Sequence, residues 1–87
     1  MVFILLPAYN EEETLPRLLD RLSSMNKFVG EDWKILIVND GSTDGTRDAA
    51  LRHPLAMEQR IIVVDHGKNR GLARAMETGI NEFIKIV

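Results

Sequence analysis

The sequence contains no cysteine, which excludes disulfide bonds, thiolate chemistry and cysteine-built metal sites. It also has no apolar run near the roughly 18–20 residues that a membrane-spanning helix needs. Its formal charge of −2 and its scattered basic residues provide no general attraction for nucleic acid or an acidic membrane surface. We therefore expect a cytoplasmic protein that has no nucleic-acid partner.

The rest of the composition is typical of a globular protein. Of the 87 residues, 45% are apolar and 28% are charged. A chain of this length buries roughly 60–65% of its unfolded surface, which is enough for a modest core. Residues 1–87 are accordingly expected to form one small domain.

Three apolar runs predict the strands of a sheet. They are "VFILL" (2–6), "KILIV" (34–38) and "RIIVV" (60–64). Each run is continuous rather than alternating, as in parallel strands that are covered on both faces. The first run lacks a basic leader and is followed by three glutamates, so we interpret it as a buried strand and not as a signal peptide.

Helical patterns separate these runs. Periodic leucines after Thr14 predict a first helix with Thr14 as its N-cap. A second helix is expected over residues 46–53, where Pro54 would end it, and a third over residues 70–83. Trp33 lies in the connection before the second strand and is expected to pack against the sheet edge. The βαβαβα order predicts an α/β fold, a three-layer Rossmann-like half domain with a parallel sheet.

Polar loops follow the carboxyl ends of all three predicted strands. They are "PAYNEEE" (7–13), "NDGSTDGT" (39–46) and "DHGKNRG" (65–71). Ligands of open parallel sheets bind at the carboxyl ends of the strands. We therefore sought candidate functional residues in these loops.

The first loop carries Tyr9 directly beyond a strand that Pro7 stiffens at its exit. The tyrosine ring can stack on a planar heterocycle while its hydroxyl stays in water. A surface tyrosine in an ordinary loop fits this segment equally well, so both interpretations stay open.

The second loop carries Asp40, followed by Gly41, which permits close backbone approach. A carboxylate at this position can accept the N–H donors on the Watson–Crick edge of uracil or guanine. The alternative is an Asx-turn that satisfies only neighbouring amides. For Asp44, which precedes a second glycine, we favour this turn and helix-cap interpretation.

The third loop places Lys68 and Arg70 between two glycines at the start of a helix, where a phosphate could meet cations and backbone N–H groups. The loop matches neither a Walker motif nor a GxGxxG fingerprint. His53 and His66 lack partners at metal-ligand spacing and are expected to be plain surface residues. We identify no catalytic residue and no metal-binding residue.

Three segments together resemble the start of a family 2 glycosyltransferase with the GT-A fold. They are "ILLPAYNEEETLPRLL" (4–19), "ILIVNDGSTDGT" (35–46) and "NRGLARAMETG" (69–79). Their order and spacing are similar to those of the polyprenyl- and dolichol-phosphate sugar synthases. The resemblance covers nearly the whole chain.

The resemblance implies an inverting transfer of a sugar from a UDP- or GDP-linked donor. It implies that the nucleoside is held by Pro7, Tyr9, Glu11, Val38 and Asp40, and that Lys68 to Gly71 lie near the ribose and phosphates. Relatives commonly have two aspartates where this chain has Asn39 and Asp40. The resemblance implies that the aspartate retained in this chain, Asp40, is the one that contacts the base.

The resemblance also implies what these 87 residues lack. In the family, the Asp-x-Asp metal motif, the acceptor site and the catalytic base follow later in the chain. Mg²⁺ or Mn²⁺ is therefore expected for the full-length enzyme but has no ligands here. We expect the nucleotide-binding half of a transferase, a truncated GT-A domain that is inactive alone. The full-length protein would act on a lipid-phosphate acceptor at the cytoplasmic face of a membrane.

In the family's sheet the first strand is interior, so here residues 2–6 would form an exposed apolar edge. We expect this edge to support a homo-oligomer.

Two other functions remain open. One is a non-catalytic nucleotide-binding or assembly module of the same fold, and the other is a phospho-acceptor receiver domain. The receiver pattern fits poorly, because Asp65 follows the third strand but the first strand is followed only by Glu11 to Glu13.

Overall fold

A parallel three-stranded sheet forms the centre of the molecule, in a computed structural model that describes residues 2–25 and 32–86. Its strands are β1 (Val2–Ala8), β2 (Trp33–Asp40) and β3 (Ile61–His66), with β2 in the middle. Both pairings are parallel, as the continuous apolar runs predicted. β2 is buried at every position except Lys34, whereas the outer strands are mostly half-buried, because only the middle strand has neighbours on both sides.

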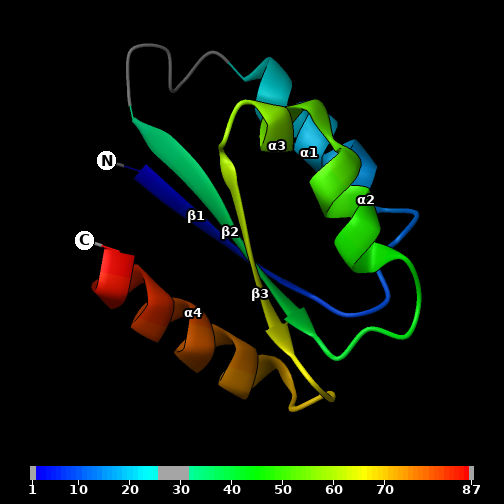
Figure 1. Ribbon diagram of the computed structural model, residues 1–87, viewed down its shortest axis with the longest axis vertical. Coiled ribbons are helices and arrows are strands. Elements are labelled where there is room, and N and C mark those ends of the chain that lie inside the picture. Colours follow the sequence, from blue (N-terminus) through cyan, green and yellow to red (C-terminus); the bar gives the residue numbers. More distant parts are fainter. Residues whose placement is uncertain (1, 26–31, 87) are drawn as a thin grey trace.

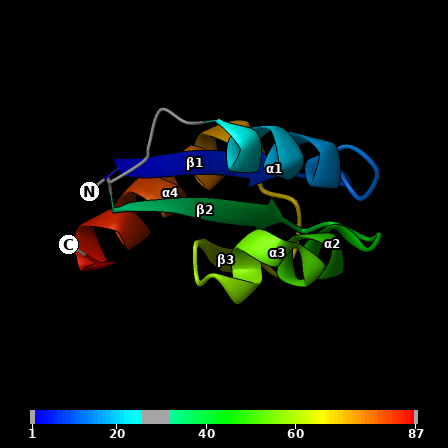
Figure 2. The ribbon, with the colours of Figure 1, turned by 90° about the horizontal axis from the view of Figure 1, so that it is seen from above.

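Helices cover both faces of the sheet. Figure 1 shows α1 (Leu15–Ser24), α2 (Thr46–Arg52) and α3 (Pro54–Met57) on one side and α4 (Leu72–Ile86) on the other. In the view of Figure 2, α1 lies toward β1, while α2 and α3 lie toward β3, which they contact. The predicted three-layer α/β architecture is thus confirmed. None of the helices in the described ranges has the length and apolar character that a membrane crossing requires.

The main core lies between the sheet and α1 to α3. It is formed by apolar side chains that alternate along the strands and by residues of the three helices, namely Ala8, Leu15, Leu19, Trp33, Ile35, Ile37, Ala50 and Leu55. On the opposite face, α4 buries only Ala75 and Gly79 fully. Several larger apolar residues of α4 are substantially exposed, including Leu72, Met76 and Ile80. The α4 layer is therefore the more open of the two.

The first helix begins as expected, with Thr14 in the N-cap position. The second helix ends one residue before His53, and Pro54 then begins α3 instead of only ending a helix. Proline is well tolerated in the first turn because it has no N–H to lose there. The predicted sequence of elements therefore missed one short helix.

His53 is the N-cap of this extra helix, so its prediction as a plain surface residue was wrong. The side chain is 6% exposed, and its Nδ1 accepts a hydrogen bond from the backbone N–H of Leu55 at 3.1 Å. Its Nε2 lies 2.7 Å from Oδ1 of Asp20 on α1. Because Nδ1 accepts, the ring proton is on Nε2 and is donated to Asp20. The ring thus joins α1 to α3.

Trp33 is the first residue of β2 and belongs to the core, so it lies in the sheet itself and not in the preceding connection. The guanidinium of Arg60 stacks over the indole, 4.6 Å from the ring centre. The connection was predicted over residues 26–33, of which residues 26–31 lie outside the described residues.

Candidate functional site

A cavity of about 220 Å³ with a mixed lining, called the polar cavity below because it contains Glu11 and Asp40, lies at the carboxyl ends of β1 and β2, beside the start of α4. Its lining consists of Pro7, Ala8, Tyr9, Glu11, Asp40, Asn69, Gly71, Leu72 and Ala75. Five of the seven residues predicted to hold a nucleotide are in this set. Residues from three separate segments of the chain therefore converge where an open parallel sheet binds its ligands.

The other two predicted residues, Val38 and Lys68, do not line this cavity. Val38 is completely buried within β2. Lys68 is exposed on the loop between β3 and α4, which also carries Asn69. Backbone atoms of this loop pack directly against Gly41, where an added Cβ would lie 2.1 Å from the Asn69 nitrogen. Gly41 has a φ of +72°, so both conformation and space require glycine there.

The loop after β1 is held to the loop after β2 by hydrogen bonds. Asn10, at a φ of 51°, donates its backbone N–H to the Ser42 hydroxyl at 2.9 Å, and its side-chain oxygen accepts from the Thr43 N–H at 2.8 Å. The Glu11 N–H donates to the Thr46 hydroxyl at 2.8 Å. These bonds fix the segment that carries Tyr9 and Glu11 into the cavity wall.

Asp44 holds the loop after β1 and the start of α2 together, because its carboxylate accepts the backbone N–H groups of Glu12 and Thr46. Its Oδ1 accepts the backbone N–H of Thr46 at 3.0 Å, which confirms the predicted Asx-turn, whereas the N-cap residue of α2 is Gly45 and not Asp44. The hydrogen bond from the Thr46 hydroxyl is the main reason that the pKa of Asp44 lies below its ordinary value. Asp44 thus serves the fold, as its sequence position indicated.

Asp40 is the central charged group of the cavity. Its side chain is 6% exposed and accepts three hydrogen bonds. Oδ1 accepts from Nδ1 of His66 at 2.7 Å and from the Arg70 N–H at 2.9 Å, and Oδ2 accepts from the Gly71 N–H at 2.9 Å. The carboxylate therefore joins the end of β2 to the end of β3 and the start of α4.

These bonds keep Asp40 ionised. Burial raises the pKa of the carboxyl, but the hydrogen bonds from His66, Arg70 and Gly71 outweigh burial and hold the pKa below its ordinary value. They stabilise the folded chain above about pH 4, the ordinary pKa of aspartate. This stabilisation is lost as the pH falls through the lowered pKa.

His66 was expected to be a plain surface residue, and this prediction was wrong. Its side chain is 8% exposed, and its Nε2 lies 2.7 Å from the Thr78 hydroxyl on α4. Asp40 and His66 are register partners in the parallel pairing of β2 with β3. The alignment of the two strand ends, "VND" with "VDH", was the sequence signal for this contact.

Asn39 points to the opposite face of the sheet from Asp40, because side chains alternate along a strand. Its Nδ2 donates to Oδ1 of Asp65 at 2.9 Å, and Oδ2 of Asp65 accepts from Nε of Arg47 at 2.8 Å. An aspartate at position 39 would instead place two carboxylates against each other. Asparagine at this position therefore suits the neighbouring Asp65 and leaves the cavity unchanged.

The described residues do not provide a ligand set for a divalent cation. No group of three or more histidine, aspartate or glutamate residues in ranges 2–25 and 32–86 is arranged to hold a metal. Glu11, Glu12 and Asp44 lie in one acidic cluster, but each already accepts a hydrogen bond from a nearby hydroxyl or backbone N–H. Mg²⁺ and Mn²⁺ need several free oxygen ligands. These residues therefore do not fit the metal that the full-length enzyme is expected to use.

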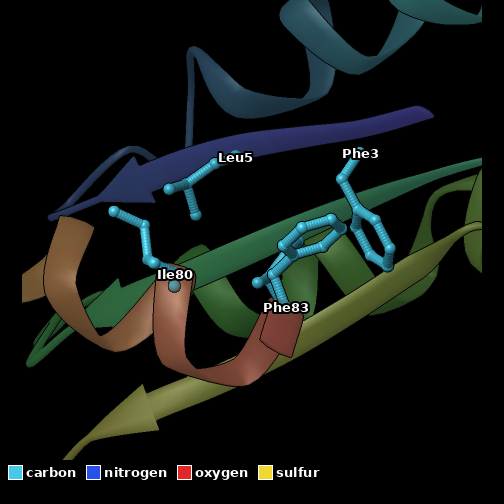
Figure 3. A pocket seen from close by; sticks show the side chains of 6 residues that line it. Phe3, Leu5, Ile80 and Phe83 are labelled. Atoms are coloured by element: carbon cyan, nitrogen blue, oxygen red, sulfur yellow. The ribbon is translucent and has the colours of Figure 1, made fainter. Parts of the chain in front are cut away.

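A second cavity of about 250 Å³ lies under the same helix, farther along α4. Figure 3 shows Phe3 and Leu5 of β1 pointing toward Ile80 and Phe83 of α4. The rings of Phe3 and Phe83 meet edge to face, with centroids 4.7 Å apart. This cavity has an apolar lining and carries none of the predicted site residues.

Comparisons with known proteins agree with the resemblance seen in the sequence. The model of the family described as "Glycosyl transferase family 2" matches residues 3–83. Undecaprenyl-phosphate 4-deoxy-4-formamido-L-arabinose transferases are similar over most of this chain. The one from Pectobacterium carotovorum is 32% identical over 95% of the chain, and the one from Yersinia enterocolitica is 35% identical over 93%.

A solved structure is also similar. It is a mannosyltransferase from Pyrobaculum calidifontis in complex with GDP-Man and Mn²⁺, with a TM-score of 0.80 and 25% identity over 93% of this chain. The chain spans about a quarter of the length of each of these proteins, 25% of the two curated relatives and 24% of the solved one.

Proposed function

The chain belongs to glycosyl transferase family 2 and has the GT-A type of fold, and on this premise we propose that it binds the nucleotide of a nucleoside-diphosphate sugar. The observation that carries the proposal is the convergence of Pro7, Tyr9, Glu11, Asp40 and Gly71 on one cavity at the carboxyl ends of the strands. A buried carboxylate there is kept ionised by three donors. Such a group is suited to the N–H donors of a base.

Each residue has a distinct role in this proposal. Asp40 accepts a hydrogen bond from the base, and the ring of Tyr9, a residue that is 46% exposed, stacks on the base. Val38 lies buried two residues before Asp40 and supports its backbone. Lys68 stands outside the cavity lining on an exposed loop, where its ammonium can meet a phosphate oxygen.

The reaction of the full-length protein is part of the same proposal. It would transfer the sugar with inversion to a lipid-phosphate acceptor at the cytoplasmic face of a membrane. The names of the undecaprenyl-phosphate transferases support this acceptor class, and the Mn²⁺ of the solved mannosyltransferase supports a divalent metal. Residues 1–87 are then one nucleotide-binding portion that is inactive alone, since the described part offers no metal ligand set.

Titration calorimetry of the 87-residue chain with UDP, GDP and their sugars tests the proposal. We expect binding of at least one nucleotide without added metal. Asp40→Ala should weaken it by roughly tenfold or more, because the base loses a charged acceptor. Asp20→Ala is the matched control, since Asp20 also lies 2.7 Å from a histidine but is remote from the cavity lining.

Two results would contradict the proposed nucleotide binding. If none of the nucleotides tested binds, the cavity is not a nucleotide site. If a folded Asp40→Ala variant binds with unchanged affinity, Asp40 does not have the assigned role. Sugar transfer by the purified chain alone would show that the portion is a complete enzyme. Binding without any transfer, even by a longer protein of which the chain is part, would favour the non-catalytic module.

A further inference from the structure

The comparisons leave the identity of the base open, whereas the hydrogen bonds of Asp40 restrict it. An ionised carboxylate can accept about four hydrogen bonds, roughly two at each oxygen. Oδ1 already accepts from His66 and from the Arg70 N–H. Among the described residues, Oδ2 accepts only from the Gly71 N–H. The acceptor capacity that Asp40 can still offer to a ligand is thus concentrated on Oδ2.

His66 holds this distribution in place. A carboxylate only accepts, so Nδ1 of His66 carries the proton that it donates to Asp40. The opposite nitrogen is held by the Thr78 hydroxyl at 2.7 Å. The imidazole is therefore anchored at both ends, with its side chain 8% exposed, and cannot turn away from Oδ1 without breaking a buried hydrogen bond.

We propose that His66, anchored by Thr78, is a positioning residue that sets base specificity through Asp40. By occupying Oδ1, it leaves one acceptor position for the ligand. The site then suits a base edge with a single N–H donor between two carbonyl groups, which is the pattern of uracil. This inference rests on the proposed nucleotide-binding function and deepens it.

Guanine would need two free acceptor positions on Asp40, one on each carboxylate oxygen. Its Watson–Crick edge presents two adjacent N–H donors, which a carboxylate satisfies best with one oxygen for each. Pairing of both with Asp40 would require Oδ1 to release His66 or the Arg70 N–H, leaving a buried donor unsatisfied. Asn69 also lines the cavity, and its amide can donate to a carbonyl of uracil.

The ratio of the dissociation constants for UDP and GDP is the deciding measurement, obtained by titration calorimetry on the whole 87-residue chain. We expect the natural sequence to prefer UDP by roughly tenfold or more. His66→Leu removes the donor and should bring the ratio close to one. His66→Asn is the matched control, because its Nδ2 can take the place of Nδ1 and should retain the preference. Thr78→Val frees the far end of the ring and should reduce the preference to a smaller extent.

The ratio of the UDP and GDP dissociation constants separates a positioning role of His66 from a structural one. A general loss of folded protein would weaken the binding of both nucleotides equally and leave this ratio unchanged. Equal or tighter binding of GDP by the natural sequence would overturn the inference while leaving the proposed function intact. An unchanged ratio in both His66→Leu and Thr78→Val would also overturn it. If His66→Leu does not fold, as judged by circular dichroism, Thr78→Val and His66→Asn carry the test. Absence of binding to either nucleotide would overturn the proposed function and this inference together.

Discussion

Two cavities of similar volume lie under the same helix and over the same two strands, yet their chemistry differs. The one near the start of α4, about 220 Å³, contains Asp40 and the loops beyond the strand ends. The one near its end, about 250 Å³, is lined by Phe3, Leu5, Leu36, Gly79, Ile80 and Phe83. Similar size therefore says little about function.

The difference follows from position along the strands. Within a strand, the backbone N–H and C=O groups are used by the sheet, so a cavity there exposes only side chains. Beyond the strand ends, backbone N–H groups of Arg70 and Gly71 are free to hold a carboxylate. The polar cavity can therefore recognise a polar ligand, whereas the apolar one can only bury hydrophobic surface.

Gly41→Ala should have the largest effect and should destroy the polar cavity. The new Cβ would collide with the backbone of residues 68–69 and would occupy a positive φ, at a cost of about 3 kcal/mol in the free energy of unfolding. Chemical denaturation and nucleotide titration should both show the loss. Gly67→Ala is the control, because a Cβ there meets no atom within 4 Å. Equal stability of the two variants would contradict the close packing of the two loops.

Phe83→Ala should damage the apolar cavity and spare the polar one. Phe83 is 37% exposed and its ring packs edge to face on Phe3, so we expect its removal to lower the free energy of unfolding by about 2 kcal/mol. Nucleotide affinity should remain unchanged, because Phe83 is absent from the polar lining. Ile84→Ala, at a 64% exposed position on the same helix, should have little effect on either quantity. A large loss of affinity in Phe83→Ala would show that the two cavities are coupled.

Association between copies should show the smallest effect. In the described sheet β1 pairs with β2 alone, and Ile80 beside it is 53% exposed, so we propose that this edge mediates a homo-oligomer. Ile80→Lys should weaken association by roughly tenfold, as expected for losing one buried apolar side chain. Sedimentation velocity over a range of concentrations measures this, with Ile84→Lys as the control. A natural chain that stays monomeric at high concentration would contradict the proposal.

The sheet could be predicted because each strand is a continuous apolar run and the loops between the runs carry helix signals. The short helix α3 was missed because Pro54 was interpreted as a stop, although proline also suits a helix start. The site was partly predictable for a different reason. Strand ends in a parallel sheet meet at one edge, so Tyr9 and Asp40 could be placed together.

The partners of Asp40 could not be predicted in the same way. The contact with His66 depends on the register between β2 and β3, which places residues 26 positions apart beside each other. A shift of one residue would turn His66 to the other face. The close packing of residues 68–69 on Gly41 likewise depends on where α4 docks, which no local pattern specifies.

The hydrogen bonds from Arg70 and Gly71 to Asp40 link the ligand site to completion of folding. The cavity forms only when α4 has docked, so under the proposed function a nucleotide would bind only the fully folded chain. By mass action, a ligand present at a hundred times its dissociation constant would add about 2.7 kcal/mol to the free energy of unfolding. If the proposed function is correct, the melting temperature of this small domain reports which nucleotide it prefers.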